Sequence, residues 1–179
     1  KVRNDAPSDV VCLMGCGVTT GIGAAINTAN VKPGDSVVVY GVGGVGLAAV
    51  MGAKLAGAGN IIAVARSQNK LDMAKELGAD HVVNPNEVED PVAKVGELNV
   101  GMGCASAIEA AGVSSVMQQA FGSIHSGGIC VIAGMAPMID TLTFMPFEFL
   151  LGKTIKGTVQ GDIIGSVDVP KLVDMYMAG

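Results

Sequence analysis

The chain has 179 residues, of which 50% are hydrophobic and 15% charged, and its formal net charge is −5. This length is enough for one domain with a sizeable core. The acidic balance and the lack of a long basic run argue against nucleic acid as a partner. An uncharged run at 37–53 is shorter than the roughly 20 residues of a membrane-spanning helix and is interrupted by clustered glycines, so no membrane partner is expected either.

Apolar runs of strand length alternate with amphipathic segments along most of the chain. After a polar stretch at 1–9, residues 10–30 are helix-like in their second half, although glycines loosen the first half. Strands are predicted at 36–41, 60–65, 80–84, 105–110, 127–134 and 154–159. Helices are predicted at 44–56, 69–78, 114–124, 144–152 and 169–177, and no element is predicted at 85–103. This order is typical of an α/β fold with a doubly wound, six-stranded parallel sheet of the Rossmann type, forming a single domain over 1–179.

A glycine-rich loop, Gly41-Val-Gly-Gly-Val-Gly46, joins the first predicted strand to the next helix. Gly41 allows a sharp turn out of the strand, Gly43 leaves room for a pyrophosphate, and Gly46 allows close packing of helix on strand. The helix that begins at Gly44 directs its N-terminal amides at the phosphates. Because a second strand follows, the pattern predicts dinucleotide binding in preference to a simple tight turn between strand and helix.

The second predicted strand ends without the acidic residue that usually binds the adenosine ribose of NAD. The chain has Ala65, Arg66 and Ser67 there, and no Asp or Glu occurs between Asp35 and Asp72. The missing carboxylate removes the repulsion of a 2′-phosphate, the arginine supplies a planar charged donor for it, and the serine adds a hydroxyl. We therefore expect NADP to be preferred, with NAD possible. The alternative is that Arg66 is a solvated surface charge and that the site accepts either cofactor.

The chain resembles the cofactor-binding domain of the zinc-dependent medium-chain alcohol dehydrogenases. The resemblance is carried by LMGCGVTTGIGAA at 13–25 and by the glycine loop with its flanking strands, and it continues through AKELGADHVVNP, CVIAG, GKTIKGT and VPKLVDMYMAG. It covers essentially the whole chain. The branch that includes glutathione-dependent formaldehyde dehydrogenase and aryl-alcohol dehydrogenases is the most similar. The family has a second, β-rich catalytic domain on the N-terminal side, which the resemblance implies is absent from this chain.

The resemblance implies an oxidoreductase that passes hydride between a zinc-bound alcohol or aldehyde and a nicotinamide cofactor. It assigns Cys16 as one of the protein ligands of the catalytic zinc. The positions that it matches to cofactor contacts are Thr20 and Val45 at the nicotinamide, Ala133 and Thr158 at its carboxamide, and Lys70 near the adenosine ribose.

The chain alone offers few zinc ligands. Catalytic zinc usually has three protein ligands, and the two histidines, His81 and His125, lack metal-ligand spacing to Cys16. Cys12 is interpreted as a core residue. We expect zinc to bind weakly or not at all unless this chain is part of a longer protein.

Other functions remain open at this point. They are a zinc-free reductase of the same superfamily, a stand-alone NADP-binding or sensing module without catalysis, and a methyltransferase that uses S-adenosylmethionine. Cys16 argues against the first, and the match at GKTIKGT argues against the last.

The resemblance also predicts a partner and a location. Family members pair through the last strand, which implies a homodimer joined near 154–159, where apolar residues lie by a free sheet edge. The 4 cysteines are scattered in apolar surroundings, which favours reduced thiols and a cytoplasmic location.

Overall fold

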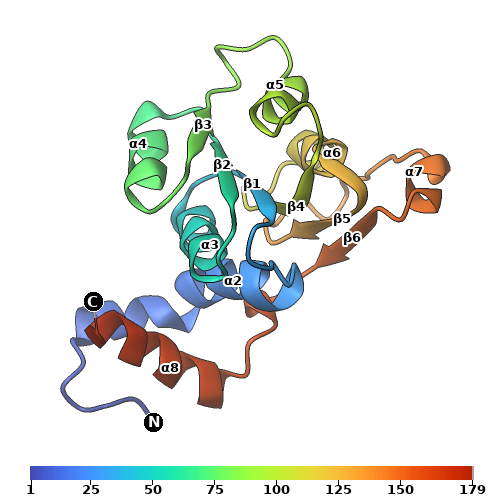
Figure 1. The fold of residues 1–179 in the computed structure, drawn as a ribbon. Helices are drawn as coiled ribbons and strands as arrows, with labels where there is room; N and C mark the ends of the chain where they lie inside the picture. Colours follow the sequence, from blue (N-terminus) through green and yellow to red (C-terminus); the bar gives the residue numbers. More distant parts are fainter. Residues whose placement is uncertain (179) are drawn as a thin grey trace.

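The computed structural model describes residues 1–178 and shows helices packed on both faces of a single parallel sheet (Figure 1). The strand order is β3-β2-β1-β4-β5-β6. The strands are β1 (Ser36–Tyr40), β2 (Asn60–Val64), β3 (His81–Val83), β4 (Cys104–Glu109), β5 (Ile124–Ile132) and β6 (Thr154–Gly157). All neighbouring strands pair in parallel, so the predicted doubly wound fold is confirmed.

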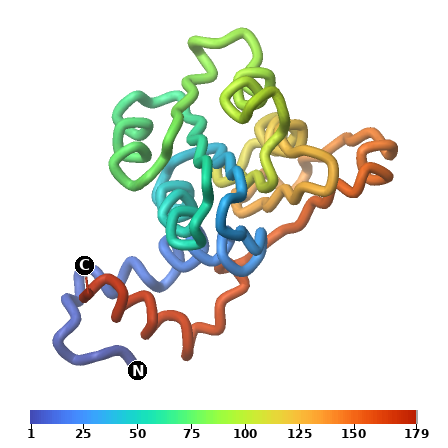
Figure 2. The backbone as a smooth tube through the Cα atoms, in the orientation of Figure 1, coloured from blue at the N-terminus to red at the C-terminus, as the bar shows by residue number. Residues whose placement is uncertain are grey.

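The helical segments of the described residues connect the strands and extend the chain at both ends. They are α1 (Ser8–Val11), η1 (Cys12–Gly15), α2 (Gly17–Gly23), η2 (Ala24–Thr28), α3 (Gly44–Leu55), α4 (Gln68–Glu76), α5 (Pro91–Leu98), α6 (Ser114–Gly122), α7 (Pro146–Leu150), η3 (Gln160–Asp162) and α8 (Gly165–Ala178). The last helix, α8, lies beside the N-terminal segment and away from the sheet (Figure 2). Arg3 and Asp174 form an ion pair of 3.7 Å there.

Strand β1 is buried on both faces, which explains its unbroken apolar sequence. Val37 and Val39 pack in one core cluster with residues of α3 and η2. Val38 and Tyr40 point to the opposite face and pack in a second cluster with residues of α6. All four side chains are at most 1% exposed. The uncharged run at 37–53 is therefore a strand, a loop and most of a helix.

Helical structure in residues 10–30 is more extensive than the sequence predicts. The glycines that were expected to loosen this segment lie instead where another backbone approaches it. A Cβ added to Gly21 would lie 2.1 Å from the carbonyl oxygen of Val45, and one added to Gly23 would lie 2.3 Å from that of Gly161. These glycines allow α2 to pack closely against two other segments.

The prediction for residues 85–103 was wrong, because this stretch contains α5. The Asp90 carboxylate caps the helix, with Oδ1 accepting from the amides of Val92 and Ala93 at 2.8 and 3.2 Å. Pro91 is the first helical residue. An aspartate at the N-cap followed by proline is a known signal for a helix start, so the sequence contained the information.

Most boundaries differ from the prediction by one or two residues, and two differ by more. Strand β5 begins at Ile124 rather than 127, because Ile124 already pairs with Cys104 before a bulge shifts the register to Ile129 opposite Ser106. Helix α8 begins at Gly165 rather than 169 and contains Pro170 in its second turn.

Among residues 1–178 no single helix is long and apolar enough to cross a membrane, although Ser8–Gly15 and Gly17–Thr28, which meet at 57°, satisfy the length and composition criterion as a pair.

Candidate cofactor-binding site

A pocket of about 580 Å³ lies at the carboxyl ends of the central strands. Its walls include Gly41 after β1, Ala65 after β2 and Ala110 after β4. Strands β2 and β3 lie on one side of β1, and β4 to β6 lie on its other side. The order of the strands therefore reverses between β1 and β4, and this is the topological switch point, where doubly wound folds bind their ligands.

The glycine loop forms one side of the pocket, and its glycines differ in their surroundings. Gly41 has a φ of 84°, in the left-handed region that favours glycine. A Cβ added to Gly46 would lie 1.9 Å from the carbonyl oxygen of Gly41 and 3.5 Å from Val39 Cγ1, so the helix packs closely on β1 and on the backbone that follows it. Gly43 and Gly44 face open space, with no heavy atom within 4 Å of an added Cβ. Since Gly43 is the N-cap of α3, the helix amides adjoin this free space.

The residues predicted to read the adenosine ribose are brought together on the opposite side of the pocket. Ala65, Arg66, Ser67 and Lys70 all line it. Arg66 and Lys70 are exposed, and neither forms an ion pair within residues 1–178. Ser67 is the N-cap of α4, but its hydroxyl makes no capping hydrogen bond. The side chains of Arg66, Lys70 and Ser67 therefore border the pocket without an ion-pair or capping partner among the described residues.

Several residues of this pocket were not predicted from the sequence. Pro85 and Asn86, which follow β3, and Gln119 of α6 also line it. Pro85 and Asn86 could have been found, because residues that follow parallel strands gather at the carboxyl edge of the sheet. Gln119 lies on a helix far along the chain, and no sequence feature indicates that it would line this pocket.

The remaining predicted site residues lie outside this pocket. Ala133 and Thr158 directly follow β5 and β6 at the same edge of the sheet. The amide of Ala133 donates to the Glu109 carbonyl at 2.8 Å, and the amide of Thr158 donates to the Ile132 carbonyl at 3.0 Å. Val45 is half-buried in the first turn of α3.

The two residues predicted nearest to the reaction lie on or beside α2. Thr20 is buried in the helix, with 8% of its surface exposed. Cys16 is exposed at the N-cap of α2, and its carbonyl accepts a hydrogen bond from Thr19 Oγ1 at 2.8 Å.

Cys16 fits a zinc site as a single ligand only. Within residues 1–178 no three His, Cys, Asp or Glu side chains are placed to hold a metal ion. Catalytic zinc takes three ligands from protein. The described residues therefore do not form a complete zinc site by themselves.

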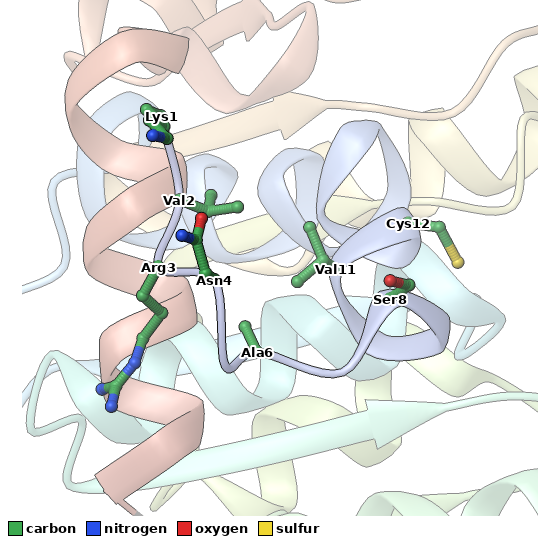
Figure 3. Close-up of a pocket in the computed structure, with 8 residues that line it drawn as sticks. All are labelled: Lys1, Val2, Arg3, Asn4, Ala6, Ser8, Val11 and Cys12. Atoms are coloured by element: carbon green, nitrogen blue, oxygen red, sulfur yellow. The ribbon is translucent and has the colours of Figure 1, made fainter.

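A second cavity, of about 500 Å³, lies at the N-terminal segment and is lined by residues between Lys1 and Cys12 (Figure 3). None of the predicted cofactor residues borders it. Cys12 was expected in the core, but it is exposed and its Sγ donates to the Asp9 carbonyl at 3.1 Å. Met14 is the buried residue of this 3-10 segment.

Two buried titratable residues support the pocket. Burial raises the pKa of Glu109. Its Oε1 accepts from the amides of Ala111 and Gly112 at 2.9 and 2.8 Å and so holds the loop that follows β4. The Tyr40 hydroxyl lies 2.6 Å from Ser123 Oγ, and burial raises its pKa to about 12. These contacts fix the walls of the pocket.

The layered fold and the switch-point pocket beside a glycine loop define a domain of the Rossmann type. Residues 44–177 match the model of the zinc-binding dehydrogenase family. The chain belongs to this family.

The relatives agree with the branch expected from the sequence. The chain is 43% identical to alcohol dehydrogenase class-3 of Myxine glutinosa and 42% identical to S-(hydroxymethyl)glutathione dehydrogenase of Photobacterium damsela subsp. piscicida. All of the chain aligns, against 48% and 49% of those proteins, so the chain spans about half the length of the curated relatives it matches. Among solved structures, benzyl alcohol dehydrogenase from Acinetobacter calcoaceticus is 38% identical, with a TM-score of 0.94 over 100% of this chain and 49% of that one. The resemblance is confirmed.

Proposed function

We propose that the chain is the cofactor-binding half of an oxidoreductase that passes hydride between an alcohol or aldehyde and a nicotinamide cofactor, with NADP preferred to NAD. The pocket at the switch point carries this proposal, because the glycine loop and a group of free cations border it from opposite sides. The family and the names of the relatives, which include alcohol and benzyl alcohol dehydrogenases, support the substrate class.

The cofactor would lie across the carboxyl edge of the sheet. Its pyrophosphate would occupy the free space at Gly43, where the first amides of α3 donate to it. The adenosine would lie over the end of β2. The nicotinamide would then extend over the ends of β4, β5 and β6, toward Ala133, Thr158 and Thr20.

The choice of NADP would depend on the end of β2. Ala65 leaves no carboxylate to repel a 2′-phosphate, and Arg66, Ser67 and Lys70 offer donors to it. A hydrogen bond to a charged group contributes about 1.5–3 kcal/mol. One such bond corresponds to a preference of about ten- to a hundredfold for NADP.

Cys16 would be this chain's ligand to a catalytic zinc ion. A zinc ion held by this thiolate and by ligands outside the chain would supply Lewis-acid activation of the substrate oxygen. The chain's own contribution is to orient the nicotinamide beside that ion. We also propose a reducing, cytoplasmic location, in keeping with four cysteines that are all free thiols.

The Ala65→Asp variant tests cofactor selectivity. The added carboxylate would repel the 2′-phosphate and accept from the ribose hydroxyls of NAD. We expect the ratio of Kd values for NADH and NADPH, measured by fluorescence titration of the purified chain, to shift toward NADH by at least about tenfold.

Two further variants serve as a matched pair in the same titration. Arg66→Ala should weaken NADPH binding, while Lys75→Ala removes an exposed cation from α4 outside the pocket and should not. Unchanged selectivity in the Ala65→Asp variant would contradict the NADP assignment. A chain that binds neither cofactor would contradict the proposed function.

A further inference from the structure

The chain leaves β6 through a strained turn, residues 158–162, which we call the β6 turn. Gln160, Gly161 and Asp162 have φ values of 53°, 69° and 53°. Three consecutive left-handed residues are rare, and the conformation is unfavourable for a side chain such as that of Gln160. Such a backbone persists only where its surroundings hold it in place.

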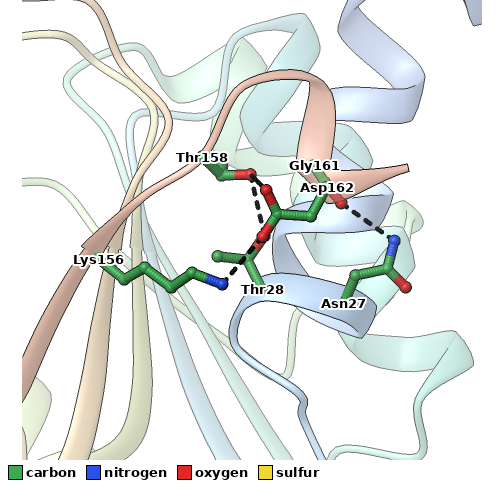
Figure 4. A network of polar contacts seen from close by, with 6 residues as sticks. All are labelled: Asn27, Thr28, Lys156, Thr158, Gly161 and Asp162. Atoms are coloured by element: carbon green, nitrogen blue, oxygen red, sulfur yellow. Dashed lines mark hydrogen bonds and ion pairs between the residues drawn. The ribbon is translucent and has the colours of Figure 1, made fainter. Parts of the chain in front are cut away.

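The Asp162 carboxylate binds three side chains, of which those of Thr28 and Lys156 lie outside the β6 turn (Figure 4). Its Oδ2 accepts from Thr28 Oγ1 and from Lys156 Nζ, both at 3.0 Å. Its Oδ1 accepts from Thr158 Oγ1 at 3.3 Å, and Thr28 Oγ1 lies 2.9 Å from Thr158 Oγ1. The hydrogen bonds from Lys156 and Thr28 lower the pKa of Asp162, so the carboxylate is charged near neutral pH.

The backbone of the β6 turn is also fixed against α2 and η2. Asn27 Nδ2 donates to the carbonyl of Gly161 at 3.0 Å. A Cβ added to Gly161 would lie 2.6 Å from both Gly23 Cα and the Thr19 carbonyl oxygen. Thus the turn and the helix are in direct backbone contact.

Helix α2 also packs against the glycine loop. Gly21 lies so close to the first turn of α3 that an added Cβ would be 2.1 Å from the Val45 carbonyl oxygen. A continuous series of backbone contacts therefore runs from the glycine loop through α2 to the β6 turn. Thr158, at the carboxyl end of β6, is tied into the last step of this series.

We propose that Asp162 is a positioning residue for the nicotinamide end of the cofactor. The inference rests on the proposed function. With the adenosine over β2, the dinucleotide crosses the switch point toward the ends of β4 to β6, where the β6 turn and α2 meet. Asp162 holds the turn in its strained conformation, and the turn sets the distance between the Thr158 backbone and α2. The nicotinamide half of the cofactor would bind between these two segments, so its affinity would depend on that distance.

The experiment compares a whole cofactor with the same molecule lacking nicotinamide. The full chain is titrated with NADPH and with 2′-phospho-ADP-ribose, and in parallel with NADH and ADP-ribose. We expect Asp162→Ala to weaken NADPH about tenfold, the size of one lost hydrogen bond, and to leave 2′-phospho-ADP-ribose within about twofold. The NADH and ADP-ribose pair should show the same split.

Two variants at the same position separate the side chain from the backbone. Asp162→Asn keeps an acceptor and a residue that tolerates the left-handed region, so most of the NADPH affinity should return. Asp162→Gly keeps the backbone but removes the acceptor, so it should behave like Asp162→Ala. Asp174→Ala, which removes an exposed aspartate of α8, should change neither titration.

The outcomes are distinguishable. An equal loss for both members of a pair, or no loss for either, overturns the positioning role and leaves the proposed function intact. If the unaltered chain binds none of the four compounds, the proposed function fails and the inference fails with it. Thermal unfolding of each variant identifies any that does not fold. If Asp162→Ala does not fold, the Asp162→Asn and Asp162→Gly variants test the positioning role.

Discussion

At the residue scale, Gly43 and Gly46 of the glycine loop have different surroundings. Gly46 has the Gly41 carbonyl against it, whereas Gly43 borders empty space. A methyl group at the first position must displace backbone, but a methyl group at the second can be accommodated. A side chain at Gly46 should therefore affect folding, whereas a side chain at Gly43 should affect binding.

The variants Gly46→Ala and Gly43→Ala should show this separation. Overpacking against backbone should cost Gly46→Ala about 1–3 kcal/mol in the free energy of unfolding. Gly43→Ala should change stability by less than about 1 kcal/mol. It should nevertheless weaken NADPH binding by about tenfold or more, because its methyl occupies the space proposed for the pyrophosphate.

Urea unfolding and NADPH titration of both variants provide the measurements. Gly44→Ala is the control for stability, since its added Cβ also meets nothing within 4 Å. Full NADPH affinity in Gly43→Ala would refute the placement of the pyrophosphate.

The sequence predicts single residues well where a local backbone requirement exists. Gly41 was expected to turn sharply, and its φ is 84°. Cys12 was misplaced, because nothing in the local pattern distinguishes the exposed side of a short 3-10 segment from the side that Met14 buries. The contact between Asp162 and Thr28 could not be predicted either, because the two residues are 134 positions apart in the chain.

At the scale of elements, the agreement depends on how continuous the apolar pattern is. The central strands β1 and β2 are uninterrupted apolar runs, and both end within one residue of the prediction. Helix α5 was missed because it has only 8 residues, of which Val95 alone is fully buried, so its apolar pattern is too short to stand out within a polar stretch. Its start depends on a cap, which a search for periodic residues does not detect.

The cap of α5 leads to a prediction for Asp90→Ala. Removing the carboxylate leaves the amides of Val92 and Ala93 without their acceptor. We expect a loss of about 1 kcal/mol in the free energy of unfolding, measured with urea. The exposed neighbour Glu89 provides the control, and Glu89→Ala should unfold like the unaltered chain. An Asp90→Ala variant of undiminished stability would show that α5 does not need this cap.

The whole molecule has two sheet edges, and β6 forms one of them. Most of β6 is exposed, and Val159 and Ile164 nearby are 85% and 65% exposed. An exposed strand edge with apolar neighbours is suited to pairing with another strand. We propose that two copies of the chain pair through β6.

A charge beside this edge should weaken the pairing. We expect Val159→Lys to shift the chain from dimer toward monomer in sedimentation velocity at micromolar concentration, because two lysines would meet near the twofold axis. Met73→Lys places the same charge on α4, where Met73 is 48% exposed, and should leave the sedimentation unchanged. A monomeric unaltered chain would rule out the homodimer.

The two halves of the candidate site also differ in how the chain assembles them. On the adenosine side, the glycine loop and the four residues at the end of β2 that are proposed to bind the ribose all lie within residues 41–70. The nicotinamide side joins Thr28 to Asp162, which are 134 residues apart. Contacts of such separation require closure of a long loop and form slowly. During folding the chain would therefore gain a place for the nucleotide before it gains a place for the reactive ring.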